Sequence, residues 1–483
     1  MPLLSTLISL IESPISDDTI ANRPLYVLGD MHYSYQDMLN RVAQLQQYLY
    51  ENSAPKDNIV VTGHKEFDMY CLAIACVVSN RRFIPVDNSL DNSRLTTIID
   101  ICRPALIFNC TGKNCSVDAA INTDAIEGDF TQISQAHLPS PDDIAYIIFT
   151  SGTTGTPKGV QVSIEALEDF LEWTTSKFFN FSEQEVFVNH ALYSFDLSVF
   201  ELWTALATQN SILALTHDNN TNSRKNIRQL AGNEATCFVA TPSFIELLLL
   251  DWKFSASSIP TLKAFVFCGE ILQKSTVKAL NERFPNATIF NLYGPTEATC
   301  ATTGVIVTSK EFNSEGALTV GKVKPDTSIL IDETTKEVII SGKNVAHGYI
   351  NVPHSDAFFE HNGVRAYRTG DAGYLDSDGQ LFITGRIDRQ VKLHGYRIEL
   401  DEIEHHLNQV IAGQVAVLAI YNQEKVIGIC AYLASSENIS LEDIHTMLAN
   451  RIPTYMFPTV IKSLEVMPLN ANGKIDRKAL AAI

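Results

Sequence analysis

The chain has 483 residues, of which 45% are hydrophobic and 19% charged, and this balance excludes a disordered or fibrous protein. At about 150 residues per domain, the length predicts two or three domains. The net charge of −19 argues against nucleic-acid binding, and no apolar run approaches the ~20 residues of a membrane helix, so neither nucleic acid nor a membrane is an expected partner.

The first residues, MPLLSTLISLIESPISDD, predict the first helix of a domain. No Lys or Arg precedes their apolar part, which argues against a secretory signal. The nine cysteines are odd in number and include no CxxC pair, so neither a metal site nor a disulfide framework is expected. Most lie in apolar strings, where reduced cysteine behaves as a small core residue, and this favours a cytoplasmic protein.

Between residues 145 and 291, short apolar runs alternate with amphipathic ones. This pattern predicts repeated strand–helix units, which are typical of an α/β protein with parallel sheets covered by helices. In such sheets ligands bind beyond the carboxyl ends of the strands. The predicted strands are Ala145–Phe149, Cys237–Ala240, Ala264–Phe267 and Thr288–Asn291, and the predicted helices follow Ser163 (an expected N-cap), follow Ala240, and span Leu272–Arg283.

The pattern changes after about residue 320. Short β-type runs at Ser328–Ile331, Glu337–Ile340 and Gln380–Ile383 predict a small β subdomain over about 320–387. A compact α+β segment follows from Asp388 onward. We therefore predict a large N-terminal domain, 1–387, and a small C-terminal domain, 388–483. The smaller domain carries a net charge of only −2.

Two loops have the composition of a nucleotide site. The run FTSGTTGTPKGV at 149–160 crowds glycines and hydroxyls after a strand, and Lys158 adds charge, which suits phosphate oxygens. It is not a P-loop, and a flexible surface turn explains its composition about equally well. The run NLYGPTEAT at 291–299 offers Tyr293 to a base, Thr296 to a phosphate and Glu297 to a divalent cation.

Two later motifs complete the set. In YRTGDAGY, Asp371 follows a glycine turn and can hold two ribose hydroxyls, and Arg386 in FITGRID is a second polar contact or part of a local ion pair with Asp388. Lys474 in NGKIDRK lies nine residues before the end. On its own, such a lysine is more often a solvated surface charge.

Together and in this order, the motifs resemble the adenylate-forming superfamily of amino-acid adenylation domains, acyl-CoA synthetases and luciferases, from about residue 20 to the end. The runs YSFDLSV, FCGE, YGPTEAT, KLHGYRIELDEIEHHL and NGKIDRK are most similar to the stand-alone D-alanine–carrier protein ligases. The resemblance implies a ligase that uses ATP and Mg²⁺ to form an acyl-adenylate and then passes the acyl group to a thiol. It also implies that the C-terminal domain swings about a hinge at Asp388.

The resemblance assigns a role to each candidate residue. Lys474, Glu297 and Thr296 are the expected catalytic groups, with Glu297 holding the metal. Asp196 is expected to pair with a substrate ammonium, Cys268 and Cys300 to line the side-chain pocket, and Lys474 to touch the substrate carboxylate. The ATP contacts are expected to be Thr150, Ser151, Lys158, Asn291, Leu292, Tyr293, Gly294, Pro295, Thr296, Asp371, Ile383, Thr384, Gly385, Arg386 and Lys474.

Two departures from the family pattern leave the identity of the acid open. Phe200 and Glu201 stand where the D-alanine ligases have Met-Asp, and Cys300 stands where they have an aliphatic residue. D-Alanine is the leading candidate, while L-alanine, glycine and L-proline stay open. An acyl-CoA synthetase is disfavoured because Asp196 would then be buried without a partner. A catalytically dead regulatory or binding module is disfavoured because the motifs retain all of their charged residues.

The thiol is expected on a separate carrier protein with a phosphopantetheine arm. Only nine residues follow Lys474, and the sequence contains no serine attachment motif of the GGxS type. Because such carriers are acidic, the near-neutral segment after Asp388 is the predicted docking surface, with Lys392 and Arg397 at its centre. Pairing of Arg397 with Glu399 or Glu402 is the structural alternative.

Overall fold

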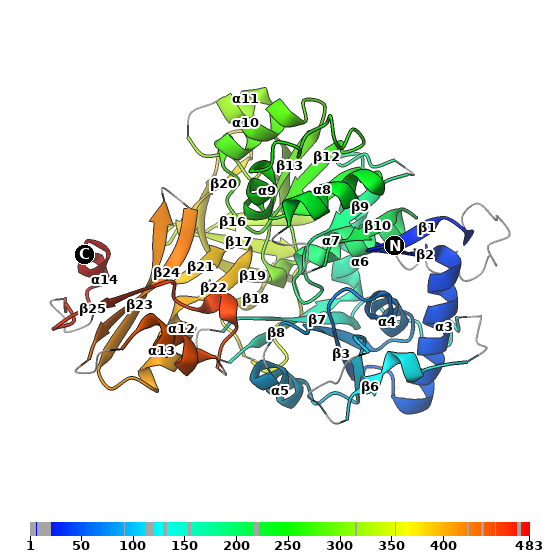
Figure 1. The fold of residues 1–483 in the computed structure, drawn as a ribbon, viewed down its shortest axis with the longest axis horizontal. Helices are drawn as coiled ribbons and strands as arrows, with labels where there is room; N and C mark the ends of the chain where they lie inside the picture. Colours follow the sequence, from blue (N-terminus) through cyan, green and yellow to red (C-terminus); the bar gives the residue numbers. More distant parts are fainter. Residues whose placement is uncertain are drawn as a thin grey trace.

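The computed structural model describes residues 6, 21–90, 92–112, 117, 119–128, 133–152, 156–182, 184–216, 222–313, 316–352, 354–422, 425–435, 439–449, 451–470 and 475–483. Figure 1 shows a large body of helix-covered sheets and, on the left in orange and red, a smaller unit formed by the end of the chain. The helix expected at the start of the chain falls almost entirely outside the described residues.

A six-stranded sheet forms one half of the body. Its strand order is β6-β5-β3-β4-β7-β8, and all neighbours are parallel except β7 and β8. The strand predicted at Ala145–Phe149 is confirmed as the core of β7. The bounds are β3 Asn58–Gly63, β4 Arg82–Asp87, β5 Leu106–Asn109, β6 Ile121–Asn122, β7 Ile144–Thr150 and β8 Lys158–Ser163.

A nine-stranded sheet forms the other half, in the order β15-β14-β13-β12-β11-β9-β10-β1-β2. Its centre, from β13 to β1, is parallel, and antiparallel strands close both edges. The three strands predicted here are confirmed, with β13 two residues longer than expected. The bounds are β1 Pro24–Leu28, β2 Met31–Ser34, β9 Val186–Asn189, β10 Ser211–Ala214, β11 Cys237–Ala240, β12 Ala264–Phe267, β13 Thr288–Tyr293, β14 Thr303–Ile306 and β15 Lys322–Val323.

Helices cover both sheets and join them. Nearly every residue of α4 is buried, and α4 shares one apolar cluster with strands of both sheets. Ser163 caps α6 by accepting the Ala166 N–H, as the sequence predicts. The bounds are α3 Tyr35–Asn52, α4 Phe67–Val78, α5 Asn92–Cys102, α6 Ile164–Thr174, α7 Leu197–Ala207, α8 Ser223–Gly232, α9 Pro242–Leu249, α10 Lys274–Arg283 and α11 Ser309–Asn313.

The predicted β subdomain is a five-stranded sheet in the order β16-β17-β19-β18, with β20 paired to β19. The antiparallel register of β19 and β20 places Asp371 opposite Arg386, and so brings two candidate nucleotide residues together. The bounds are β16 Thr327–Ile331, β17 Glu337–Gly342, β18 Phe358–His361, β19 Val364–Leu375 and β20 Leu381–Arg386.

The C-terminal unit has a core of its own. Its main apolar cluster contains only residues between Val391 and Ile461, and its fold is α+β as predicted. Within the described residues, no helix is long and apolar enough to cross a membrane. The bounds are β21 Gln390–Leu393, β22 Tyr396–Glu399, α12 Leu400–Asn408, β23 Gln414–Asn422, β24 Lys425–Ala434, α13 Leu441–Leu448, β25 Val460–Ser463 and α14 Arg477–Ala481.

Candidate active site

A cavity lies where the carboxyl ends of β7, β12 and β13 meet the β21–β22 hairpin. Its body side comes from both large sheets and from the β subdomain, and its other side comes from the C-terminal unit. The lining residues are Ile148–Ser151, Ser194–Leu197, Cys268, Gly269, Gly294–Thr296, Cys300, Asp371, Arg386, Gln390, Lys392, Gly395, Arg397 and Tyr455.

The β21–β22 hairpin reaches this cavity through a tight turn. His394 and Gly395 both have positive φ, 53° and 84°, which suits a two-residue hairpin turn. A Cβ at Gly395 would stand 2.7 Å from Cγ2 of Thr241, so the close approach requires glycine. The Gly395 N–H donates to Oε1 of Glu270 at 2.7 Å and fixes the turn against the body.

The body side of the cavity contains a short pocket. Asp196 ends the loop before α7, and it makes no side-chain cap on that helix. Burial raises the pKa of the Asp196 carboxyl, and the Thr296 hydroxyl and Lys392 oppose that rise. Cys268 and Cys300 form a buried wall, with Sγ of Cys268 3.6 Å from the Cys300 carbonyl oxygen. The pocket therefore pairs one half-buried carboxylate with a small apolar wall.

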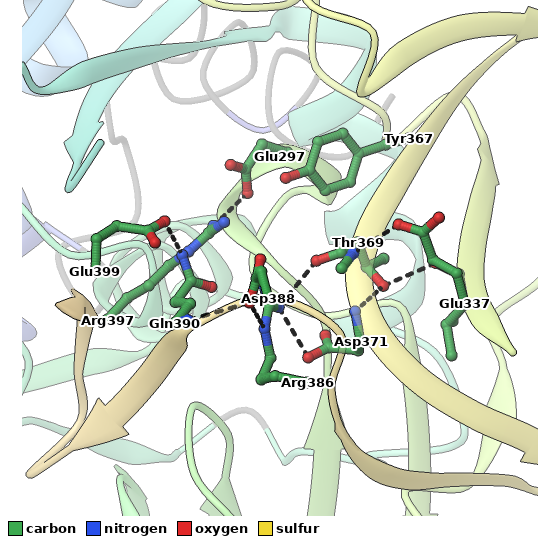
Figure 2. A network of polar contacts seen from close by, with 12 residues as sticks. Glu297, Glu337, Tyr367, Thr369, Asp371, Arg386, Asp388, Gln390, Arg397 and Glu399 are labelled. Atoms are coloured by element: carbon green, nitrogen blue, oxygen red, sulfur yellow. Dashed lines mark hydrogen bonds and ion pairs between the residues drawn. The ribbon is translucent and has the colours of Figure 1, made fainter. Parts of the chain in front are cut away.

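Glu297 directly follows Thr296 in the chain, and its side chain is completely buried. The Tyr349 hydroxyl donates to its Oε1 at 2.8 Å. Nη1 of Arg397 donates to its Oε2 at 2.6 Å (Figure 2). Burial opposes ionisation of Glu297, but Arg397 and the Tyr349 hydroxyl together favour the charged form, and the pKa of this carboxyl lies below its ordinary value. The site at Glu297 thus holds a negative charge that needs a cationic partner.

Asp371 is the second buried carboxylate. The Tyr293 hydroxyl donates to its Oδ2 at 2.6 Å, and Nη1 of Arg386 donates to its Oδ1 at 2.8 Å. Arg386 also donates through Nε to Asp388 at 2.8 Å, so the local ion pair that the sequence offered for it is present (Figure 2). Arg386 therefore links the expected hinge residue to the carboxylate expected at the ribose.

Not every sequence-predicted residue lines the cavity. The amide of Asn291 donates to the Thr319 carbonyl, and Leu292 packs in the apolar core. Ile383 packs in the β subdomain, and the Lys158 ammonium lies 5.4 Å from the centre of the Tyr349 ring. Thr153–Gly155 and Lys474 lie outside the described residues.

Sequence reasoning missed an aromatic cluster at the domain boundary. Phe195, beside Asp196, meets the rings of Tyr396 and Tyr455 at 5.0 and 6.4 Å, and the two tyrosines stack at 3.9 Å. No local signal marks this cluster, because its members lie about 200 and 260 residues apart along the chain.

The predicted docking role of Arg397 is wrong for this arrangement. Arg397 lines the cavity and pairs with Glu297, not with Glu399 or Glu402, and Lys392 also faces inward. These two cations therefore do not form the centre of an outer surface.

Comparison with known proteins agrees with this geometry. Residues 17–350 match the family of AMP-binding enzymes, which is more than half of the chain. The chain belongs to the AMP-binding enzymes. This membership confirms the superfamily predicted from the motifs.

Curated relatives of this AMP-binding enzyme carry one recurring name. It is 38% identical over 461 residues to the D-alanine–D-alanyl carrier protein ligase of Bacillus licheniformis, a match covering 91% of each chain. It is 36% identical over 498 residues to the ligase of the same name from Lacticaseibacillus rhamnosus, covering 96% of this chain and 97% of the relative.

Solved structures share the fold at lower identity. The Vibrio cholerae adenylation domain AlmE, in complex with glycyl-adenosine-5'-phosphate, has a TM-score of 0.84 at 21% identity and covers 99% of this enzyme and 97% of its own chain. A nonribosomal peptide synthetase protein containing adenylation and PCP domains also has a TM-score of 0.84, at 23% identity, and covers 99% and 83%. These likenesses confirm the predicted α/β multidomain fold.

Proposed function

We propose that this enzyme activates D-alanine as aminoacyl-AMP and transfers it to the phosphopantetheine thiol of a separate carrier protein. The observation that carries the proposal is the pocket in which half-buried Asp196 lies with the wall of Cys268 and Cys300. Withdrawing a carboxylate from water is costly unless it meets a cation, and a substrate ammonium supplies one. The names of the curated relatives support the same substrate.

The pocket favours a small amino acid. Asp196 and the carboxylate-binding group expected at Lys474 would fix two substituents on the α-carbon. The thiol wall then leaves room for a short side chain and selects the configuration. One methylene changes the free energy of selection by only ~1–3 kcal/mol, so some use of glycine or serine is expected.

In the first half-reaction, a carboxylate oxygen of the amino acid bonds to the α-phosphorus of ATP, and the bond to pyrophosphate breaks. No general base is required, because the nucleophile is already ionised at neutral pH. Positioning and charge neutralisation are the main demands, since both reactants are anions. We assign Thr150, Ser151 and Thr296 to the phosphates, and Asp371 with Arg386 to the ribose.

Glu297 is the proposed Mg²⁺ ligand. Within the described residues no group of three or more His, Cys, Asp and Glu side chains could hold a metal. Mg²⁺ bound with a nucleotide typically uses one or two carboxylates together with phosphate oxygens, so a single buried carboxylate fits. The cationic partner that Glu297 already has in Arg397 shows the same demand for positive charge. Bound Mg²⁺ would supply charge for the phosphates.

In the second half-reaction, the carrier thiolate attacks the acyl carbon and AMP leaves. We propose 388–483 as the mobile domain, with Asp388 as its hinge. The residues that follow Lys474, including α14, lie at the outer end of this unit in Figure 1, away from the cavity, whereas the β21–β22 hairpin faces it. This arrangement suits thiol transfer, and a rotated one would bring Lys474 to the α-phosphate.

Loading of a carrier protein tests the proposal. The enzyme is incubated with ATP, D-alanine and a phosphopantetheine-bearing D-alanyl carrier protein, and alanyl thioester is measured by intact mass. We expect loading of that carrier and none of the carrier without its arm. Loading of coenzyme A in place of the carrier would favour an acyl-CoA synthetase.

We also propose that the enzyme is cytoplasmic. The eight cysteines in the described chain are free, which supports this proposal.

A further inference from the structure

The wall of the proposed amino-acid pocket contains two neighbouring cysteines. Sγ of Cys268 lies 3.6 Å from the carbonyl oxygen of Cys300, and both residues line the cavity. A carbonyl oxygen lies about 2.4 Å from the Cα of its own residue, so Sγ of Cys268 is within ~6 Å of the Cys300 Cα. Cys300 stands where the D-alanine ligases have an aliphatic residue, so the pair is a departure from the family pattern.

Cys268 differs from the other cysteines in how readily its thiol ionises. The neighbouring Cys300 lowers the pKa of the Cys268 thiol below its ordinary value in spite of burial, and Lys392 acts in the same direction. The thiolate is the form of cysteine that reacts with oxidants, so Cys268 is the favoured first target. In the rest of the described chain, burial raises the pKa of every cysteine thiol, at Cys71, Cys76, Cys102, Cys110, Cys237 and Cys430.

The cavity gives a small oxidant access to this wall. Its volume of about 80 Å³ is several times the ~10–15 Å³ that one water molecule requires, and hydrogen peroxide is only slightly larger than water. The same volume is far below the ~300 Å³ at which pockets for larger molecules begin. The cavity therefore favours hydrogen peroxide over bulkier oxidants.

The turn that carries Cys300 also carries a group of the proposed phosphate site. Thr296–Ala298 form a single 3₁₀ turn, and the Thr299 N–H donates to the Thr296 carbonyl at 3.2 Å. Thr299 and Cys300 both have positive φ, 55° and 66°, and the Thr299 hydroxyl donates to the Asn344 carbonyl at 2.7 Å. A strained backbone of this kind persists only where its surroundings hold it. A bond that pulls Cys300 toward the opposite thiol is therefore expected to move Thr296 as well as the pocket wall.

We propose that Cys268 and Cys300 form a reversible disulfide that disables the amino-acid pocket and so makes adenylation sensitive to hydrogen peroxide. The inference rests on the proposed function, which assigns both residues to the pocket wall. A transient, redox-sensing disulfide of this kind is compatible with a reducing cytoplasm.

The chemistry needs only peroxide and the two thiols. The Cys268 thiolate attacks one oxygen of hydrogen peroxide, which gives a sulfenic acid and releases hydroxide. The Cys300 thiol then attacks the sulfenic sulfur, the S–S bond forms, and water leaves. In total, two thiols lose two electrons and two protons, and one hydrogen peroxide becomes two water molecules. A dithiol reverses the reaction by thiol–disulfide exchange.

Peptide mapping detects the disulfide without any catalysis. The reduced enzyme is treated with hydrogen peroxide, then denatured, alkylated with N-ethylmaleimide and digested. We expect one linked pair of peptides that joins Cys268 to Cys300 and separates on treatment with dithiothreitol, while the other cysteines carry the maleimide. Oxidation spread evenly over the cysteines, with no such pair, would overturn the inference.

Cys300→Val removes the second thiol and supplies an aliphatic side chain. In this variant Cys268 is expected to stop at the sulfenic acid, which dimedone labels, whereas the parent is expected to carry little dimedone because Cys300 consumes the sulfenic acid. Equal dimedone labelling of Cys268 in the parent and in the variant would contradict the role of Cys300.

D-Alanine-dependent pyrophosphate exchange measures the consequence, and each protein is compared with its own untreated sample. In the parent, peroxide is expected to lower the exchange rate by at least about tenfold, since misplacing a site by about 1 Å can cost roughly a hundredfold. Dithiothreitol is expected to restore the rate. Cys430→Ala is the matched control, because it removes a buried thiol of the C-terminal unit, and it is expected to respond like the parent.

A complete disulfide with unchanged exchange, or the same reversible loss in Cys300→Val, would overturn the inference. If the untreated parent shows D-alanine-dependent exchange and no disulfide forms, only the inference fails. An untreated parent without any exchange on D-alanine would instead overturn the proposed function, and the peptide map would still report the disulfide.

Discussion

The two parts of the candidate site differ in which domain supplies their side chains. The proposed amino-acid pocket has its carboxylate and its thiol wall from the body alone, at Asp196, Cys268 and Cys300. The proposed nucleotide part is shared, because Glu297 and Ser151 both form hydrogen bonds with Arg397 of the C-terminal unit. A wall of buried side chains has one arrangement, whereas charged groups can exchange one partner for another. Substrate choice is therefore expected to be independent of domain orientation, and the phosphate chemistry to depend on it.

Asp196→Ala tests the fixed part and carries the largest expected effect. An ammonium bound without its carboxylate loses ~3–5 kcal/mol, so D-alanine-dependent pyrophosphate exchange is expected to fall by at least a hundredfold. Asp142→Ala, which removes an exposed carboxylate of the same domain, serves as the control. Equal activity of the two variants would remove Asp196 from the pocket.

Lys474→Ala tests the shared part. Losing one contact to transition-state charge costs ~3–4 kcal/mol, and the loss is expected in adenylate formation only. Transfer from preformed D-alanyl-adenylate to the carrier, followed in a single turnover, is expected to stay near the parent rate. An equal loss in both half-reactions would contradict the exchange of domain faces.

Cys268→Ala sharpens the comparison by changing the wall alone. The larger pocket is expected to relax the choice between D- and L-alanine by about 1–2 kcal/mol, while the KM for ATP stays unchanged. Exchange rates with the two enantiomers give the ratio. An unchanged ratio would mean that Cys268, which follows β12, is only a core residue.

Glu201→Gln tests a buried carboxylate of α7, the helix that begins after Asp196. Burial raises the pKa of Glu201 to about 8 from an ordinary 4.5, and Asn189 and Lys65 only partly offset it. Between pH 4.5 and about 8, the Glu201 carboxyl therefore keeps its proton in the folded protein and loses it in the unfolded chain. Because of this difference, Glu201 lowers the free energy of unfolding progressively as the pH rises through this window.

The substitution is expected to raise the free energy of unfolding by about 1–2 kcal/mol at pH 8, with a difference that shrinks toward pH 5.5. Denaturant unfolding at both pH values measures it, and substrate preference is expected to stay the same. A difference that grows on acidification would contradict the raised pKa.

The sequence predicted most of what depends on local pattern. Apolar runs such as Cys237–Ala240 were confirmed as strands because burial on both faces demands them. Asp371 and Arg386, which the sequence assigned to the same part of the site, lie opposite each other because they belong to two adjacent strands. Arg397 was misplaced because its partner, Glu297, lies 100 residues away, and composition does not specify which face of a domain turns inward.

The amino-acid panel for ATP–pyrophosphate exchange tests the central claim most directly. Labelled pyrophosphate entering ATP is measured with D- and L-alanine, glycine, D- and L-serine, L-proline, an aromatic amino acid and a carboxylic acid without an amino group. The proposed function predicts D-alanine as the best substrate, with weaker exchange for glycine and serine. Best activity with L-proline, the aromatic amino acid or the acid without an amino group would contradict the pocket built on Asp196, Cys268 and Cys300.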